Sequence, residues 1–248
     1  MDYVFKAIIA IIIIAVVAYT LIYIVPTLLP RVTYIMNYSA KPMIIINSNT
    51  PGFIRVNTYN GSQIRISNTI TYSPLIPRPS IHYVMEQTNN TLYAQSYSTT
   101  CPSEQFYPIY TCIISTNIYL PTDVSKLLLK ASASIVSIQV NNISFIRLDL
   151  SSSTINVKLS NIVESTLNVF SSTGVIKMQG VGNYSINAVS STITMYIPPY
   201  ACIRMNATAS MITYPGGSVN GSGSRNLIKT ACLINITLYS TSSTILIV

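Results

Sequence analysis

The residues best suited to chemistry are few in this sequence, and they do not form a catalytic pattern. His82 is the only histidine, so a metal site built on several histidines is excluded and any catalytic triad must run through it. Asp149 and Glu164 would approach each other if neighbouring repeats of the chain stacked, but no acids have the paired spacing of general acid–base catalysis. The acids are Asp2, Glu86, Glu104, Asp123, Asp149 and Glu164. We therefore expect a protein that is not an enzyme and has no cofactor and no metal.

The four cysteines fall into two local pairs, which suit an oxidising compartment. The prolines between Cys101 and Cys112 favour a turn that returns the chain to itself. Cys202 and Cys232 fall in the same part of adjacent units of the repeat described below, where neighbouring strands bring Cα atoms within bridging distance. We predict the disulfides Cys101–Cys112 and Cys202–Cys232.

Eight Asn-x-Ser/Thr sequons are candidate glycosylation sites. All of them follow the apolar segment at the N-terminus, which agrees with a body that lies outside the cell. The asparagines are Asn37, Asn60, Asn89, Asn142, Asn183, Asn206, Asn220 and Asn235.

The formal charge of +8 comes from 14 basic residues against six acids, and the basic residues are scattered from Lys6 to Lys229. Because the basic residues form no cluster, the sequence gives no indication of a surface that binds nucleic acid. Charged residues make up only 8% of the chain, whereas β-branched residues and tyrosine are plentiful and suit half-buried strands. The composition predicts an all-β fold.

An uncharged apolar run, Ala7–Val25, stands at the N-terminus, and Leu28 and Leu29 extend it. Its length is typical of a transmembrane helix and exceeds the apolar region of a cleaved signal peptide. We expect residues 1–30 to be an anchor that contacts the lipid bilayer through residues 7–29. The expected localisation is a single-pass protein of the plasma membrane, with its N-terminus in the cytoplasm and its C-terminal domain outside.

The second half of the chain repeats with a period of 19 residues. One apolar column of this repeat consists of Leu129, Leu148, Leu167, Ile186 and Met205. Within each period apolar and polar residues alternate, as in strands with one buried face, and short Ser/Thr corners separate the strands. We predict that residues 121–248 form a β-solenoid of about six coils, each with three strands, the third passing through Ile143, Ile162 or Val181. Residues 31–120 would be an irregular β region that caps the first coil; an antiparallel sandwich is the alternative fold.

The segment 117–159, with Leu120-Pro121 at the end of a strand, resembles the putative-adhesin β-solenoid domain family of prokaryotes. The segment Gly52–Ile66 is similar to the opening hairpin of that family, and the resemblance covers about residues 44–248. It implies a β-solenoid and no established biochemical function. The corners here read Ser-Ser-Thr where the family often has Ser-Gly-Asp, so no role of the corner aspartate transfers to this chain.

These features predict an extracytoplasmic surface protein that acts in adhesion or in cell-envelope interaction. Expected partners are an envelope protein, a glycan or further copies of the chain, with the Ser/Thr corners and the last coil (Thr244–Val248) as candidate contact surfaces. Lys6-Ala7 before the apolar run resembles the processing signal of archaeal type IV pilin precursors, so a filament subunit is one alternative. An accessory ectodomain of a membrane complex is the other.

Overall fold

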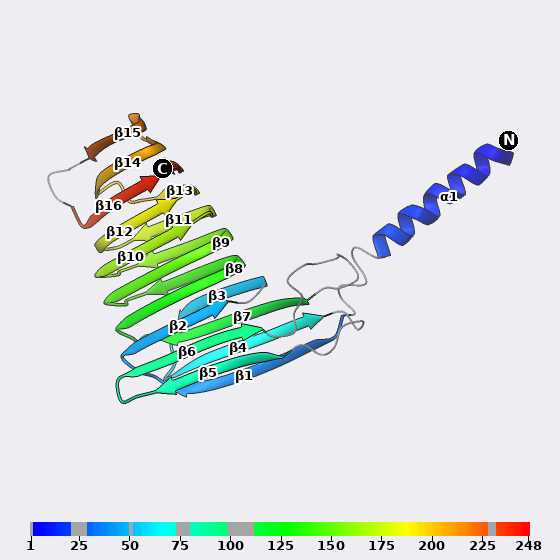
Figure 1. The fold of residues 1–248 in the computed structure, drawn as a ribbon, viewed down its shortest axis with the longest axis horizontal. Helices are drawn as coiled ribbons and strands as arrows, with labels where there is room; N and C mark the ends of the chain where they lie inside the picture. The colour runs from blue at the N-terminus through cyan, green and yellow to red at the C-terminus, as the bar shows by residue number, and fades with distance from the viewer. Residues whose placement is uncertain (1, 21–28, 50–51, 73–79, 99–111, 228–231) are drawn as a thin grey trace.

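The computed structural model describes residues 2–20, 29–49, 52–72, 80–98, 112–227 and 232–248 (Figure 1). Within these ranges the chain forms one α-helix, α1 (Asp2–Tyr19), and a single sheet of 17 strands. Figure 1 shows the strands stacked one above another along the body, with α1 projecting away from them.

Most strands are rich in alternating apolar residues, and their burial alternates accordingly; β15 (Gly217–Leu227), which is rich in glycine and serine, is largely exposed along its length. In the first half the strands are β1 (Arg31–Ser39), β2 (Met43–Asn49), β3 (Gly52–Tyr59), β4 (Gln63–Tyr72), β5 (Ile81–Gln87), β6 (Thr91–Ser98), β7 (Cys112–Pro121), β8 (Lys126–Asn141) and β9 (Phe145–Ser160). In the second half they are β10 (Glu164–Phe170), β11 (Thr173–Gln179), β12 (Gly182–Val189), β13 (Thr192–Tyr196), β14 (Ala201–Tyr214), β15 (Gly217–Leu227), β16 (Ile234–Thr241) and β17 (Thr244–Ile247).

The sheet has two walls, because the long strands β8, β9 and β14 each contribute one half to either wall. The first wall runs, strand by hydrogen-bonded strand, through β5, β6, β2, β8, β9, β10, β12, β16 and β14. The second wall runs through β1, β4, β7, β3, β8, β9, β11, β13, β17 and β14. β15 pairs in antiparallel fashion with β14.

The core consists of the inward rows of these walls. In the first wall Leu148, Leu167 and Ile186 are register partners and are fully buried or nearly so. In the second wall the corresponding inward row includes Val157 and Ile176. A fully buried aliphatic side chain contributes about 1.5–3 kcal/mol, so these rows are the main source of stability.

The predicted β-solenoid of six three-stranded coils, preceded by an irregular region and a membrane helix, is wrong in its architecture. No third strand forms at Ile143 or Ile162, which lie buried in short bends between strands, and Val181 is half exposed. Nor are residues 31–120 irregular, because their described strands are integral to both walls of the one sheet. The all-β class is correct, with a continuous sheet of parallel and antiparallel pairs in place of the coils.

The order of the strands also differs from a stack in chain order. β16 lies between β12 and β14, and β17 lies between β13 and β14, so the end of the chain is inserted between two earlier segments (Figure 1). The expectation that Thr244–Val248 offers a free edge for association is therefore wrong. Backbone pairing on both sides satisfies the strand that was expected to be open.

The predicted transmembrane anchor is also wrong. Helix α1 ends at Tyr19, before the end of the apolar run, and its 18 residues are about 27 Å long, against about 30 Å for a hydrocarbon core. Among the described residues no helix is both long and apolar enough to cross a bilayer. The expected localisation as a single-pass plasma-membrane protein depended on this anchor and is therefore wrong as well. Residues 21–28, which belong to the predicted span, lie outside the described ranges.

Candidate functional site

The outward rows of the two walls are the surfaces on which chemistry would have to occur. Neighbouring strands of a sheet lie about 4.8 Å apart, and register partners project from the same face. Each outward row is therefore a line of evenly spaced side chains that runs across the strands.

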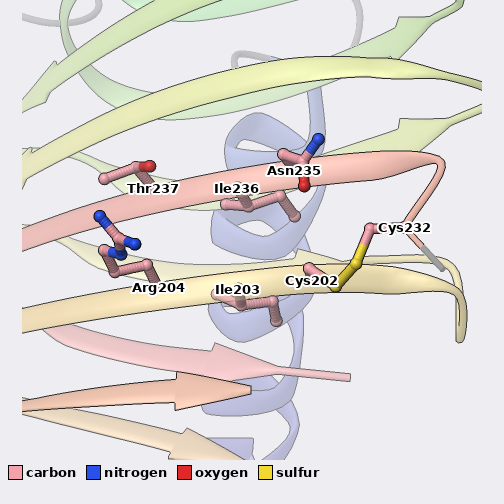
Figure 2. A pocket seen from close by; sticks show the side chains of 7 residues that line it. All are labelled: Cys202, Ile203, Arg204, Cys232, Asn235, Ile236 and Thr237. Carbon is pink, nitrogen blue, oxygen red and sulfur yellow. A yellow bond between two sulfur atoms is a disulfide. The ribbon is translucent and has the colours of Figure 1, made fainter. Parts of the chain in front are cut away.

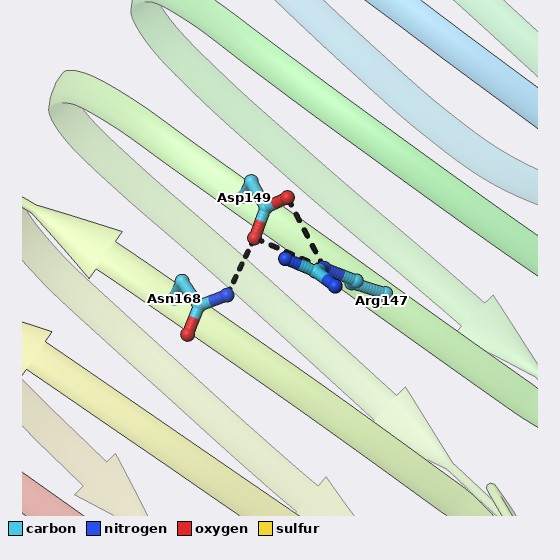
Figure 3. Close-up of polar contacts among 3 residues, drawn as sticks. All are labelled: Arg147, Asp149 and Asn168. Carbon is cyan, nitrogen blue, oxygen red and sulfur yellow. Dashed lines mark hydrogen bonds and ion pairs between the residues drawn. The ribbon is translucent and has the colours of Figure 1, made fainter.

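Asp149 is the best-connected acid on the first wall (Figure 3). Arg147 Nε donates to its Oδ2 at 3.3 Å, and Asn168 Nδ2 on the next strand donates to its Oδ1 at 2.5 Å. Glu164 pairs in register with Phe145, four residues before Asp149 on the same strand, so the approach of the two acids considered from the sequence does not occur. Asp149 is part of a polar contact between strands, and among the described residues Glu164 is not placed to act with it.

His82 and Glu86 both lie on β5, at the edge of the first wall, with their side chains exposed. His82 is thus an exposed residue within a strand. In the part of the chain that the structure describes, no three His, Cys, Asp or Glu residues come together as a metal site would require. Glu104 lies outside the described residues.

The predicted disulfide Cys202–Cys232 is confirmed, with Cα atoms 5.5 Å apart (Figure 2). It joins the start of β14 to the residues that lead into β16, and it borders a hollow of about 290 Å³ that Arg204, Asn235 and Thr237 also line. Cys112 is likewise disulfide-bonded. Its predicted partner Cys101 lies outside the described residues, so that pair stays a prediction.

The serine corners form a buried ladder and not an exposed one. Each hydroxyl after the first accepts a hydrogen bond from the backbone N–H of the preceding serine in the ladder, at 3.0–3.2 Å. The ladder consists of Ser152, Ser172, Ser191, Ser243 and Ser210, in that order. The hydroxyls are therefore used within the protein, and these buried serines offer no surface for a glycan.

The backbone at these corners explains why serine is present. Ser171, Ser190 and Ser242 have φ near +50°, which is uncommon for a residue with a side chain. In each case the next serine donates its hydroxyl to the carbonyl two residues before it, as Ser191 does to Val189 at 2.8 Å. This bond closes the tight turn between the two walls.

Three tyrosines have hydroxyls with a raised pKa, and in each case burial is the main cause: Tyr38, Tyr83 and Tyr184. Such a shift keeps the hydroxyl protonated and makes it a poor acid. These tyrosines are packing residues that carry a proton, and among the described residues no cluster of possible metal ligands forms beside them.

The sequon asparagines are placed on strands and at corners, and seven of the eight side chains are exposed, Asn206 being half-buried. Two of them touch, since Asn235 Nδ2 donates to Asn183 Oδ1 at 3.0 Å. Glycosylation of Asn235 would replace one of the two hydrogens on this nitrogen and would leave one N–H to donate. Occupancy of the eight sites stays a prediction.

Sequence reasoning missed one arrangement on the second wall, which we call the basic row. It consists of the register partners Arg65, Tyr119, Asn57, Gln139, Lys158, Lys177 and Tyr196. Its basic residues come from separate parts of the chain, and only the strand register brings them into line. The alternation of each strand places them outward, but nothing in the local sequence shows that they are neighbours.

Comparison of the sequence with family models and with curated proteins finds no match. Among solved structures, the chain is similar to a putative cell adhesion protein from Clostridium sporogenes, at 14% identity and a TM-score of 0.41 over 87% of this chain and 99% of that one. It is also similar to a putative lipid binding protein from Parabacteroides distasonis, at 12% identity and a TM-score of 0.34 over 88% and 96%. A putative adhesin from the same organism has 8% identity and a TM-score of 0.31 over 88% and 97%.

Proposed function

We propose that this protein is an extracytoplasmic binding domain that acts in adhesion or in cell-envelope interaction and does not catalyse a reaction. The observation that carries the proposal is the pair of long walls, whose outward rows present polar, basic and aromatic side chains in regular lines. Such surfaces suit a partner that is itself extended and repetitive, because contacts can recur from strand to strand.

Two further features support this proposal. The disulfide between Cys202 and Cys232 is typical of proteins exposed to an oxidising environment. Among the described residues no three of the acids, cysteines and His82 come together. The hydroxyls of the serine ladder are occupied by hydrogen bonds with the backbone. The exposed side chains of the outward rows are therefore the groups in the described structure that we propose for binding a partner.

The test is direct binding of the purified full chain to envelope fractions of the organism that encodes it. We expect saturable retention that is lost when the disulfides are reduced and the protein is unfolded. Retention equal to that of the unfolded protein would contradict the proposed binding. Release of soluble fragments from the envelope at a rate that depends on protein concentration would indicate catalysis and would also contradict the proposal.

Helix α1 favours a second candidate, a filament subunit. Its isoleucines are exposed on every side of the helix, for example Ile11 at 66% and Ile14 at 67%, and an all-round apolar helix is normally covered by other apolar surface. Bundled copies of α1 would provide that cover. Mass spectrometry of the mature N-terminus tests this candidate, because Ile8 as the first residue together with filaments in electron micrographs would support it, whereas a retained Met1 would contradict it.

A further inference from the structure

We propose that the basic row of the second wall binds an acidic polysaccharide, of the kind that carries a carboxylate on its sugar rings. This inference rests on the proposed binding function and names the ligand class and the surface for it. Three features of the row support this inference: its charge, its aromatic residues and its geometry.

The charge of the row is unbalanced. Lys158 and Lys177 are register partners on β9 and β11, so their side chains leave the same face about 4.8 Å apart. Like charges in this position destabilise a sheet. Arg55 and Arg65 add positive charge to the same wall and are exposed.

No carboxylate side chain compensates for these charges among the described strand residues of the second wall. The parts of these strands that lie in the second wall contain no Asp or Glu. Asp149 lies in the half of β9 that belongs to the first wall, Glu86 and Glu164 are on first-wall strands, and Asp123 follows the end of β7. On the first wall, by contrast, Lys130 is the register partner of Asp149. A bound anion would remove the repulsion between Lys158 and Lys177, and this gives the row a preference for acidic ligands.

The aromatic residues of the row favour a sugar. Lys177 Nζ lies over the ring of Tyr196, 5.0 Å from its centre, which holds both side chains in place. The two belong to a hollow of about 460 Å³ at this end of the row, which Gln179 and Tyr200 also line. A hollow with a cation, an amide and tyrosine rings offers a sugar ring an apolar face for its C–H groups and polar partners for its carboxylate and hydroxyls.

The geometry favours an extended polymer and disfavours nucleic acid. A broad sheet wall cannot enter the major groove of a duplex, which admits a helix or a two-stranded ribbon. Single strands are bound by bases stacked on successive aromatic rings in a basic groove, whereas Tyr119 and Tyr196 are separated by four residues of the row. An acidic polysaccharide laid across the strands meets a cation at several positions without needing a ring at each.

The test uses polygalacturonate as the acidic probe, with dextran as the neutral polymer and single-stranded DNA as the other polyanion. We expect the full chain to bind polygalacturonate, to bind dextran much less, and to lose affinity as salt is raised. The double variant Lys158→Gln/Lys177→Gln should bind about tenfold or more weakly, since two charge contacts are removed. Tyr196→Ala should weaken binding in the same direction.

The matched control is Lys126→Gln/Lys130→Gln, which removes two exposed lysines from the first wall. It should bind polygalacturonate within about twofold of wild type, and thermal unfolding should show all variants folded. Equal losses in both double variants, equal binding of dextran, no binding of polygalacturonate, or tighter binding of DNA would each overturn the inference. If the row variant still binds envelope fractions as wild type does, the proposed function stands and this ligand assignment fails.

Discussion

At the residue scale, the hydroxyls of the corner serines and of Tyr83 and Tyr184 are buried within the fold. The identity of the corner serines as turn residues could be predicted from the Ser-Ser-Thr pattern, because serine is common in turns. Their burial could not be predicted, since it depends on the stacking of corners that are distant in the chain, as Ser191 is from Ser243. Substitutions in the serine ladder should therefore change the free energy of unfolding and should not change the binding of a partner.

We expect Ser191→Ala to destabilise the protein by about 1–3 kcal/mol, because the backbone N–H of Ser172 would be left without its buried acceptor. Ser153→Ala, at an exposed position of the same corner region, is the matched control and should change stability by less than about 0.5 kcal/mol. Urea denaturation of both variants measures the difference. Equal effects would show that the ladder contributes nothing specific.

The buried hydroxyls of Tyr83 and Tyr184 predict that the protein loses stability in alkali. Burial raises the pKa of the Tyr83 and Tyr184 hydroxyls above the value of about 10 in the unfolded chain. The folded state then holds protons that the unfolded state releases, so this contribution to stability is complete below pH 10 and is lost as the pH rises through the folded-state pKa. Stability should fall above pH 10 in wild type and fall less steeply in Tyr83→Phe/Tyr184→Phe.

The comparison for this prediction is Tyr239→Phe, which alters an exposed ring on β16. Its free energy of unfolding, measured between pH 8 and pH 11, should follow the wild-type curve. A double variant whose pH dependence is as steep as that of wild type would contradict the assignment to Tyr83 and Tyr184.

At the element scale, the positions of the strands along the chain could be predicted better than the pairing between strands. The alternation in Leu148–Leu150 or Ile155–Leu159 reports which side chains are buried, since each strand must bury one face. It does not report how many walls the sheet has. Ile143 and Ile162 are apolar and buried, as a third strand would require, yet they fill the ends of the core from short bends.

The disulfide at the start of β14 belongs to this scale. Cys202 and Cys232 tie β14 to the segment that enters β16, and they close a loop of 30 residues that includes β15. Cys202→Ser/Cys232→Ser should lower the free energy of unfolding by about 2–4 kcal/mol, because the unfolded chain gains freedom. Hydrogen exchange should show the loss first at the Cys202 end of β14, and uniform exchange throughout the sheet would contradict a local role.

At the scale of the whole molecule, the basic row and the inserted C-terminal strands arise in the same way. Both depend on which strands become neighbours, and that is decided by long-range pairing. The net charge of +8 could be read from the sequence, but its concentration on the second wall could not, because Arg65 and Lys177 are more than 100 residues apart. Similarly, β16 and β17 show the same alternation of apolar and polar residues as the strands beside them. Their local sequence therefore fits a strand at the edge of the sheet as well as the position between two strands that they occupy.

Because β17 lies between β13 and β14, we expect its buried side chains to be important for the stability of the fold. Ile245 and Ile247 are buried between β13 and β14, whereas Leu246 between them is 44% exposed. Ile245→Ala should cost about 2–5 kcal/mol because it leaves a cavity in the core. Leu246→Ala, the matched control on the same strand, should cost less than about 1 kcal/mol.

Deletion of Thr244–Val248 extends this prediction to the whole sheet. It would remove the pairing of β13 and β14 with β17 and expose the apolar side chains that β17 covers, so we expect loss of cooperative unfolding or a large drop in melting temperature. Hydrogen exchange should show lost protection in β13 and in the C-terminal half of β14, which lie on either side of the missing strand. A truncated protein as stable as the full chain would mean that β17 is an outer strand after all, and the strand order described for the second wall would have to be abandoned.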